Sequence, residues 1–137
     1  MSATSAPTAP PKTFAEAIAV IEEVYEFMLA YAAQGRRREE DGEGIRERLV
    51  RAEAALAIVF SATAEEIGTE QGGGQAASEF LDVLKQDAGR ARAAFRFVLA
   101  QPAIGSQIVD NLNALTHVRT LLTDLFLLDE ALKISGI

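Results

Sequence analysis

The chain has 137 residues, of which 49% are hydrophobic, and its 13 basic and 20 acidic side chains give a net charge of -7. This composition predicts one globular domain with a single core, and no apolar run reaches the roughly 20 residues that a membrane span needs. When the chain is divided into residues 1–35, 36–67, 68–101 and 102–137, none of the four segments is net basic, so we expect no binding to nucleic acid or to an anionic membrane surface. The absence of cysteine excludes disulfides, thiolate metal sites and thiol nucleophiles.

The first twelve residues are rich in Ser, Thr, Ala and Pro and end in Pro10 and Pro11. This composition predicts a disordered N-terminal tail, residues 1–12, before a single domain over residues 13–137. The tail does not show the cationic start and apolar centre of a secretory signal, so the expected location is cytoplasmic.

A first helix is predicted from its capping signal. Thr13 stands three residues before Glu16, the spacing of a capping box, and Gly35 can supply the left-handed residue that ends a helix at about Gln34. Its apolar residues cover about 200° of the helix circumference, which is more than one neighbouring helix covers. We therefore expect this helix, with Val24, Phe27 and Tyr31 on its apolar arc, to be central or to be shared with a second copy of the chain.

Two further helices are predicted in the middle of the chain. The second covers residues 45–67, and because the residues around Ile58 carry no charge, we expect burial on both sides or an oligomer contact there. A glycine-rich linker, residues 68–75, leads into a third helix over residues 76–100. Gly89 in its interior indicates a close packing contact or a bend, since glycine weakens a helix by about 1 kcal/mol relative to alanine.

The last segment, residues 104–134, predicts one long helix. Apolar residues recur at steps of four and three and form one seam: Ile104, Ile108, Leu115, Val118, Leu122, Leu125 and Leu132. Asn111 and Asp129 interrupt the seam. A buried polar seam residue commonly fixes register or oligomeric state, so Asn111 is predicted either to lie near a symmetry partner or to be wet at the end of a bundle. Asp129 is expected to be partly exposed.

Four such helices predict an all-α fold, an antiparallel four-helix bundle that forms a homodimer or a larger homo-oligomer. The leading interpretation is a small, acidic, non-enzymatic protein that works through protein–protein contacts of an apolar helix surface, as an adaptor, a chaperone-like protein or a regulator. The residues predicted to form an interface or to fix its register are Asn111, Val24, Phe27, Tyr31 and Ile58. No cofactor is expected in this interpretation.

Two pairs of carboxylates suggest an alternative. Glu22, Glu23 and Glu26 form an E-E-x-x-E run whose last two members are one helical turn apart, and Glu79 and Asp82 form an E-x-x-D pair. Carboxylates at this spacing can share a hard cation such as Mg²⁺. Pairs of acidic residues are also common on solvated helix faces, and this second interpretation stays open beside the first.

These two motifs resemble the metal-binding motifs of the all-helical nucleoside triphosphate pyrophosphohydrolases of the MazG type. The similarity covers about a tenth of the chain, residues 21–27 and 79–84, and the motifs are about fifty residues apart, farther than the family pattern. The resemblance implies that Glu23, Glu26, Glu79 and Asp82 hold Mg²⁺ and activate a water molecule against a phosphate.

The remaining candidates are an aromatic pocket and two polar features. A third functional hypothesis is an apolar ligand pocket lined by five aromatic side chains: Phe14, Tyr25, Phe27, Phe95 and Phe97. The single histidine, His117, lies off the predicted seam and is interpreted as a surface residue. The basic run 36–38 is followed at once by acidic residues and is interpreted as a self-neutralised turn, with phosphate binding as the alternative.

Overall fold

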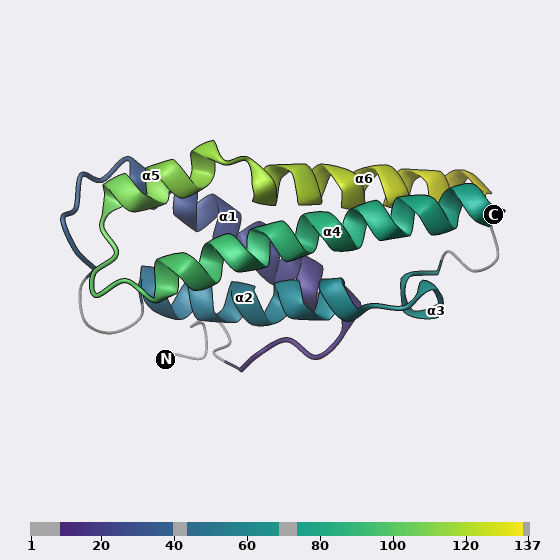
Figure 1. Ribbon diagram of the computed structural model, residues 1–137, viewed down its shortest axis with the longest axis horizontal. Helices are drawn as coiled ribbons and strands as arrows, with labels where there is room; N and C mark the ends of the chain where they lie inside the picture. The colour runs from purple at the N-terminus through teal and green to yellow at the C-terminus, as the bar shows by residue number, and fades with distance from the viewer. Residues whose placement is uncertain (1–8, 40–43, 69–73, 136–137) are drawn as a thin grey trace, which may run out of the picture.

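The computed structural model describes residues 9–39, 44–68 and 74–135, and this part of the chain contains six helices and no strand. The six are α1 (Phe14–Ala32), α2 (Ile45–Ser61), α3 (Ala64–Ile67), α4 (Gly74–Leu99), α5 (Ser106–Ala114) and α6 (His117–Ser135). Figure 1 shows the long helices running back and forth along one axis, with α5 and α6 following one another beside α4. Helix α1 packs against α2, α5 and α6, and α4 packs against α2 and α6. The all-helical prediction is confirmed.

None of the helices in these ranges has both the length and the apolar composition that a membrane crossing requires. Residues 1–8 of the predicted tail, most of the predicted turn before α2 and the glycine run of the predicted linker lie outside the described residues.

Helix α1 begins as its sequence predicts. The Thr13 hydroxyl accepts a hydrogen bond from the Glu16 amide at 3.1 Å, and the Glu16 carboxylate reaches back to the Lys12 amide at 2.8 Å, one residue earlier than a standard capping box. The helix ends at Ala32, and Gly35 adopts the predicted left-handed conformation with φ of 69°. Both end signals of this helix were therefore readable from the sequence.

The predicted helix over residues 45–67 is interrupted, and the sequence contains the reason. Helix α2 ends at Ser61, and Ala62 is extended. The Thr63 hydroxyl then accepts from the Glu66 amide at 3.2 Å while the Glu66 carboxylate accepts from the Thr63 amide at 2.9 Å, which starts α3 as a separate turn. The T-x-x-E capping signal prevails over the continuous apolar pattern, so the prediction of one helix is wrong here.

Helix α4 confirms the third predicted helix and explains its interior glycine. A Cβ added at Gly89 would lie 3.0 Å from the Phe60 ring, so glycine allows α2 and α4 to approach closely at this point. The buried side chains of α4 follow a helical stripe: Leu84, Ala88, Ala91, Phe95 and Val98. Of the two explanations for Gly89, the packing contact is confirmed.

The prediction of one long helix over residues 104–134 is wrong. Helix α5 ends at Ala114, α6 begins at His117, and Thr116 between them has a φ of 59°. A β-branched residue rarely adopts this left-handed conformation, which costs roughly 1–3 kcal/mol. The break turns Leu115, a predicted seam residue, outward to 49% exposure, while Val118, Leu122 and Leu125 stay buried. The apolar repeat is real, but two helices share it.

Candidate functional site

The structure separates the four carboxylates of the predicted magnesium site. The Glu23 carboxylate forms an ion pair with the Arg51 guanidinium of α2 at 3.3 Å, whereas Glu26 lines a cleft between α1 and α6. Glu79 and Asp82 are exposed in the first half of α4. Within the described ranges, no group of three or more His, Cys, Asp or Glu side chains could hold a metal ion. The pyrophosphohydrolase hypothesis remains a prediction from the sequence.

The predicted interface residues fall in different environments. Val24 is fully buried, and Tyr31 is buried with its hydroxyl donating to the Ile104 carbonyl at 2.6 Å. Phe27 and Ile58 are partly buried and pack against the core. Asn111 is exposed, so Asn113, not Asn111, is the α5 amide that faces α1, where it donates to the Met28 carbonyl at 3.3 Å. Whether any of these residues contacts a second copy stays a prediction. Asp129, the other polar residue of the predicted seam, is exposed as expected.

Of the five aromatic side chains of the predicted ligand pocket, Phe14 is partly buried against the core, and the other four lie in different environments. Phe95 is buried in the core, whereas Phe97, two residues later, is 69% exposed. Phe27 stacks on Tyr31 with ring centroids 6.1 Å apart. The Arg48 guanidinium carbon lies over the Phe27 ring, 4.1 Å from the ring centroid. Tyr25 lines the cleft between α1 and α6. The structure therefore does not bring these rings together around one cavity.

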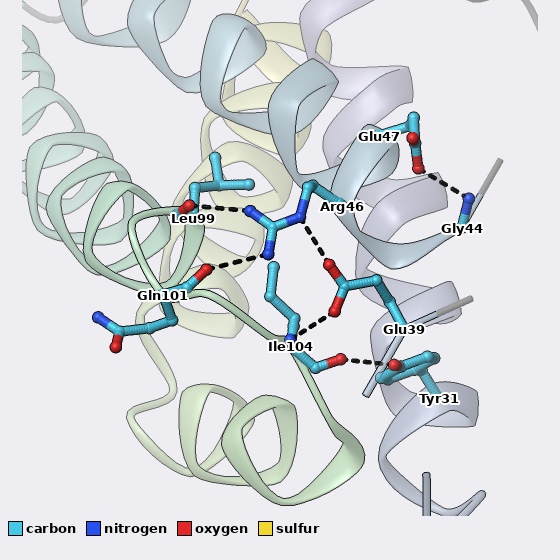
Figure 2. A network of polar contacts seen from close by, with 8 residues as sticks. All are labelled: Tyr31, Glu39, Gly44, Arg46, Glu47, Leu99, Gln101 and Ile104. Carbon is cyan, nitrogen blue, oxygen red and sulfur yellow. Dashed lines mark hydrogen bonds and ion pairs between the residues drawn. The ribbon is translucent and has the colours of Figure 1, made fainter. Parts of the chain in front are cut away.

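A polar network closes the end of the molecule where the α1–α2 and α4–α5 connections meet (Figure 2). One Glu39 oxygen accepts from the Arg46 guanidinium at 2.7 Å, and the other accepts from the Ile104 amide at 2.6 Å. The remaining guanidinium nitrogens of Arg46 donate to the Leu99 and Gln101 carbonyls, each at 3.0 Å. One arginine thus ties the start of α2 to the end of α4 and to the loop that follows.

The charge of Glu39 is stabilised by its donors. Burial raises the pKa of this carboxyl, but the Ile104 amide and the Arg46 guanidinium lower it by more, and the resulting pKa lies below the ordinary value of 4.5. Glu39 is therefore ionised at neutral pH, and we read the network as a structural clamp. Of the acidic residues predicted to neutralise the run 36–38, Glu39 pairs with Arg46, and the others lie outside the described residues, so that prediction stays untested.

The same end of the molecule contains a second, backbone-based clamp around Ser106. Its hydroxyl donates to the Tyr31 carbonyl at 2.7 Å and accepts from the Arg36 amide at 2.9 Å, while its own amide donates to the Arg36 carbonyl at 2.8 Å. Gly105 permits this approach, because a Cβ there would lie 2.5 Å from the Arg37 carbonyl oxygen. A cleft of about 700 Å³ opens beside this clamp, but its buried polar side chain, Ser106, is already fully engaged.

Two carboxyls meet across the contact between α4 and α6. Burial, followed by the hydrogen bond and charge of the neighbouring Asp87, raises the pKa of Asp124 from 3.8 to about 7. One Asp124 oxygen is buried without a hydrogen-bond partner in the described structure, and Asp87 also pairs with Arg90 at 2.9 Å. A proton on Asp124 removes the charge repulsion between the two carboxyls. The sequence signal was an aspartate inside the apolar run of residues 121–128.

A cleft of about 470 Å³ runs between α1 and α6. It is lined by Glu22, Tyr25 and Glu26 from α1 and by Arg119, Leu122, Thr123 and Phe126 from α6. Phe126 is 54% exposed, so the cleft has an apolar wall that the chain itself leaves uncovered. The arrangement offers apolar contact and two carboxylates to a bound group.

The outer faces of α4 and α6 carry further uncovered apolar side chains. Phe97 is 69% exposed and Leu127 is 60% exposed. Both lie away from the buried stripe of their own helix. No known protein family, curated protein or solved structure matches the chain.

Proposed function

We propose that this chain is a small, non-enzymatic interaction protein that self-associates and acts as an adaptor or regulator through apolar side chains on its outer helix faces. In this proposal the fold works as an antiparallel four-helix bundle, in which α5 and α6 together form a broken fourth helix.

The observation that carries the proposal is the exposure of Phe97 and Leu127, at 69% and 60%. A single exposed leucine is ordinary on a soluble protein, but phenylalanine is enriched in interfaces relative to the rest of the surface, so the exposed Phe97 favours an interaction surface. Burying such side chains against a partner gains about 25 cal/mol for each Å² of apolar surface removed from water. Aromatic residues are also the commonest anchors of protein interfaces.

The contacts elsewhere support the same interpretation. We call the end of the molecule where the α1–α2 and α4–α5 connections meet the loop end. There, the polar side chains of Glu39, Arg46 and Ser106 all form hydrogen bonds with groups of the same chain. These residues therefore serve the fold, and the uncovered apolar side chains of α4 and α6 are what the chain offers to a partner.

Sedimentation velocity over a range of concentrations tests the proposal. The wild-type chain is expected to form dimers or larger assemblies by about 100 μM, and Phe97→Ser or Leu127→Ser should weaken the association at least tenfold. Ala93→Ser, at an exposed alanine on α4, is the matched control and should leave association unchanged. A chain that stays monomeric throughout this range, with or without the substitutions, contradicts self-association.

A further inference from the structure

The cleft between α1 and α6 has an apolar floor that extends beyond its lining residues. Tyr25 and the buried Leu122 line it, together with Phe126, which is 54% exposed. Leu29 lies four residues after Tyr25, hence on the same face of α1, and is 49% exposed. The resulting apolar strip follows the helix axis, which is the shape that an amphipathic helix fills.

The charges along the cleft are unequal on its two sides. Glu22 and Glu26 stand one helical turn apart on the α1 side, whereas Arg119 is the basic residue on the α6 side. In the described part of the chain, no ion pair joins these carboxylates to the Arg119 guanidinium. The α1 rim therefore presents two carboxylates that form no ion pair with Arg119, beside an apolar strip.

This charge pattern selects among occupants. A second copy of the chain carries a net charge of -7, and in its basic stretch on α4, Arg90 already pairs with Asp87 and Arg92 with Glu53, so it complements the acidic rim poorly. A helix with apolar residues on one face and Lys or Arg along one edge matches both features, because its cations reach Glu22 and Glu26 while its apolar face covers Phe126.

We propose that the α1–α6 cleft binds a basic amphipathic helix of a partner protein, with its cationic edge on α1. This inference rests on the proposed function and names the partner chemistry of one surface. The Arg119 guanidinium lies on the opposite rim and sets the orientation, since a cationic edge placed on the α6 side would meet a like charge.

The test uses the full chain and two helical peptides that differ only in charge. The first has leucine along one face and lysine along the adjacent edge, and the second has glutamate in place of each lysine. By fluorescence anisotropy, the lysine peptide should bind at least about tenfold more tightly than the glutamate peptide. Equal binding of the two peptides, or binding of neither, overturns the proposal.

Substitutions in the cleft separate local recognition from the overall negative charge. The double variant Glu22→Gln, Glu26→Gln should lose most of the preference for lysine, whereas the matched variant Glu79→Gln, Asp82→Asn, with the same change in net charge on α4, should keep it. Arg119→Gln should strengthen binding of the lysine peptide about threefold, since it removes a like charge. An equal loss in both double variants would mean non-specific attraction and would overturn the proposal.

Phe126→Ser distinguishes the remaining occupant. This substitution should weaken peptide binding at least about tenfold and leave self-association unchanged. If Phe126→Ser instead dissociates the homo-oligomer, the cleft is covered by a second copy and the basic-helix proposal is wrong. If cleft variants have no effect on peptides but Phe97→Ser still weakens self-association, the proposed function stands and the cleft inference alone fails.

Discussion

The loop end and helix α6 differ in how far their side chains are paired within the chain. At the loop end, Glu39 is surrounded by donors and its pKa lies below the ordinary value. On α6, Asp124 faces another carboxyl and its pKa is raised to about 7, while Phe126 stays 54% exposed. The chain thus pairs its polar groups where its connections meet, whereas α6 keeps a carboxyl beside another carboxyl and an exposed phenylalanine.

The largest expected effect is at the loop end, from Gly105→Ala. The added Cβ would meet the Arg37 carbonyl oxygen at 2.5 Å, and backbone cannot yield as a flexible side chain does, so the free energy of unfolding should fall by about 3 kcal/mol. Gly89→Ala is the matched control, since its obstacle is the half-exposed Phe60 ring and it gains helix propensity. Urea denaturation that shows equal losses for both variants would refute the clamp at Gly105.

The next largest effect is expected from Glu39→Gln, at about 2 kcal/mol near pH 7, because the Arg46 guanidinium loses its charged partner. The folded-state pKa of Glu39 is lowered, so its contribution is present above the ordinary value of 4.5 and is lost as pH falls through the folded value. The gap between variant and wild type should therefore narrow in acid. Glu130→Gln, at an exposed position on α6, should show no such gap at any pH.

Asp124→Asn should raise the free energy of unfolding above neutral pH, whereas Glu39→Gln lowers it. The raised folded-state pKa means that the stability contributed by the Asp124 proton is present below the ordinary value of 3.8 and is lost as pH rises toward about 7. Asparagine stays neutral, so the variant should exceed wild type by about 1 kcal/mol at pH 8, allowing for solvent screening, and match it near pH 4. Thermal melts at both pH values check this, with Asp82→Asn as an exposed control on α4. A variant less stable than wild type at pH 8 contradicts the carboxyl pair.

The smallest expected effect on stability is that of Phe126→Ser. More than half of this side chain is already in water, so its removal should change the free energy of unfolding by only about 0.5 kcal/mol. Denaturation in urea measures this directly. A loss of several kcal/mol would place Phe126 in the core and remove the basis for treating the cleft as an uncovered surface.

The helices were more predictable than their interruptions. The start and end of α1 followed from Thr13, Glu16 and Gly35, because capping is local in sequence. The break before α3 carried an equally local signal in Thr63 and Glu66, which the apolar pattern concealed. No glycine or proline marks the break at Thr116 in the sequence. Helices α5 and α6 each pack against α1, and contacts between distant segments leave no local sequence signal.

The sites were less predictable than the helices because their partners are distant in the chain. Glu39 and Ile104 are 65 residues apart, and no local pattern links them. The Asp87–Asp124 pair likewise requires the relative register of α4 and α6. The carboxylate spacing of Glu23 and Glu26 was real, but the direction of each side chain depends on the neighbouring helix: Arg51 of α2 holds Glu23, and Glu26 faces α6.

The most direct test of the contrast between the two regions measures peptide affinity and stability side by side in two variants. Glu39→Gln should lower the free energy of unfolding by about 2 kcal/mol and retain lysine-peptide binding at a temperature where it is folded. The Glu22→Gln, Glu26→Gln double variant should keep its stability within about 0.5 kcal/mol of wild type and lose the peptide. If Glu39→Gln abolishes binding in the folded chain while the double variant binds normally, the assignment of structure to the loop end and recognition to the α1–α6 cleft is wrong.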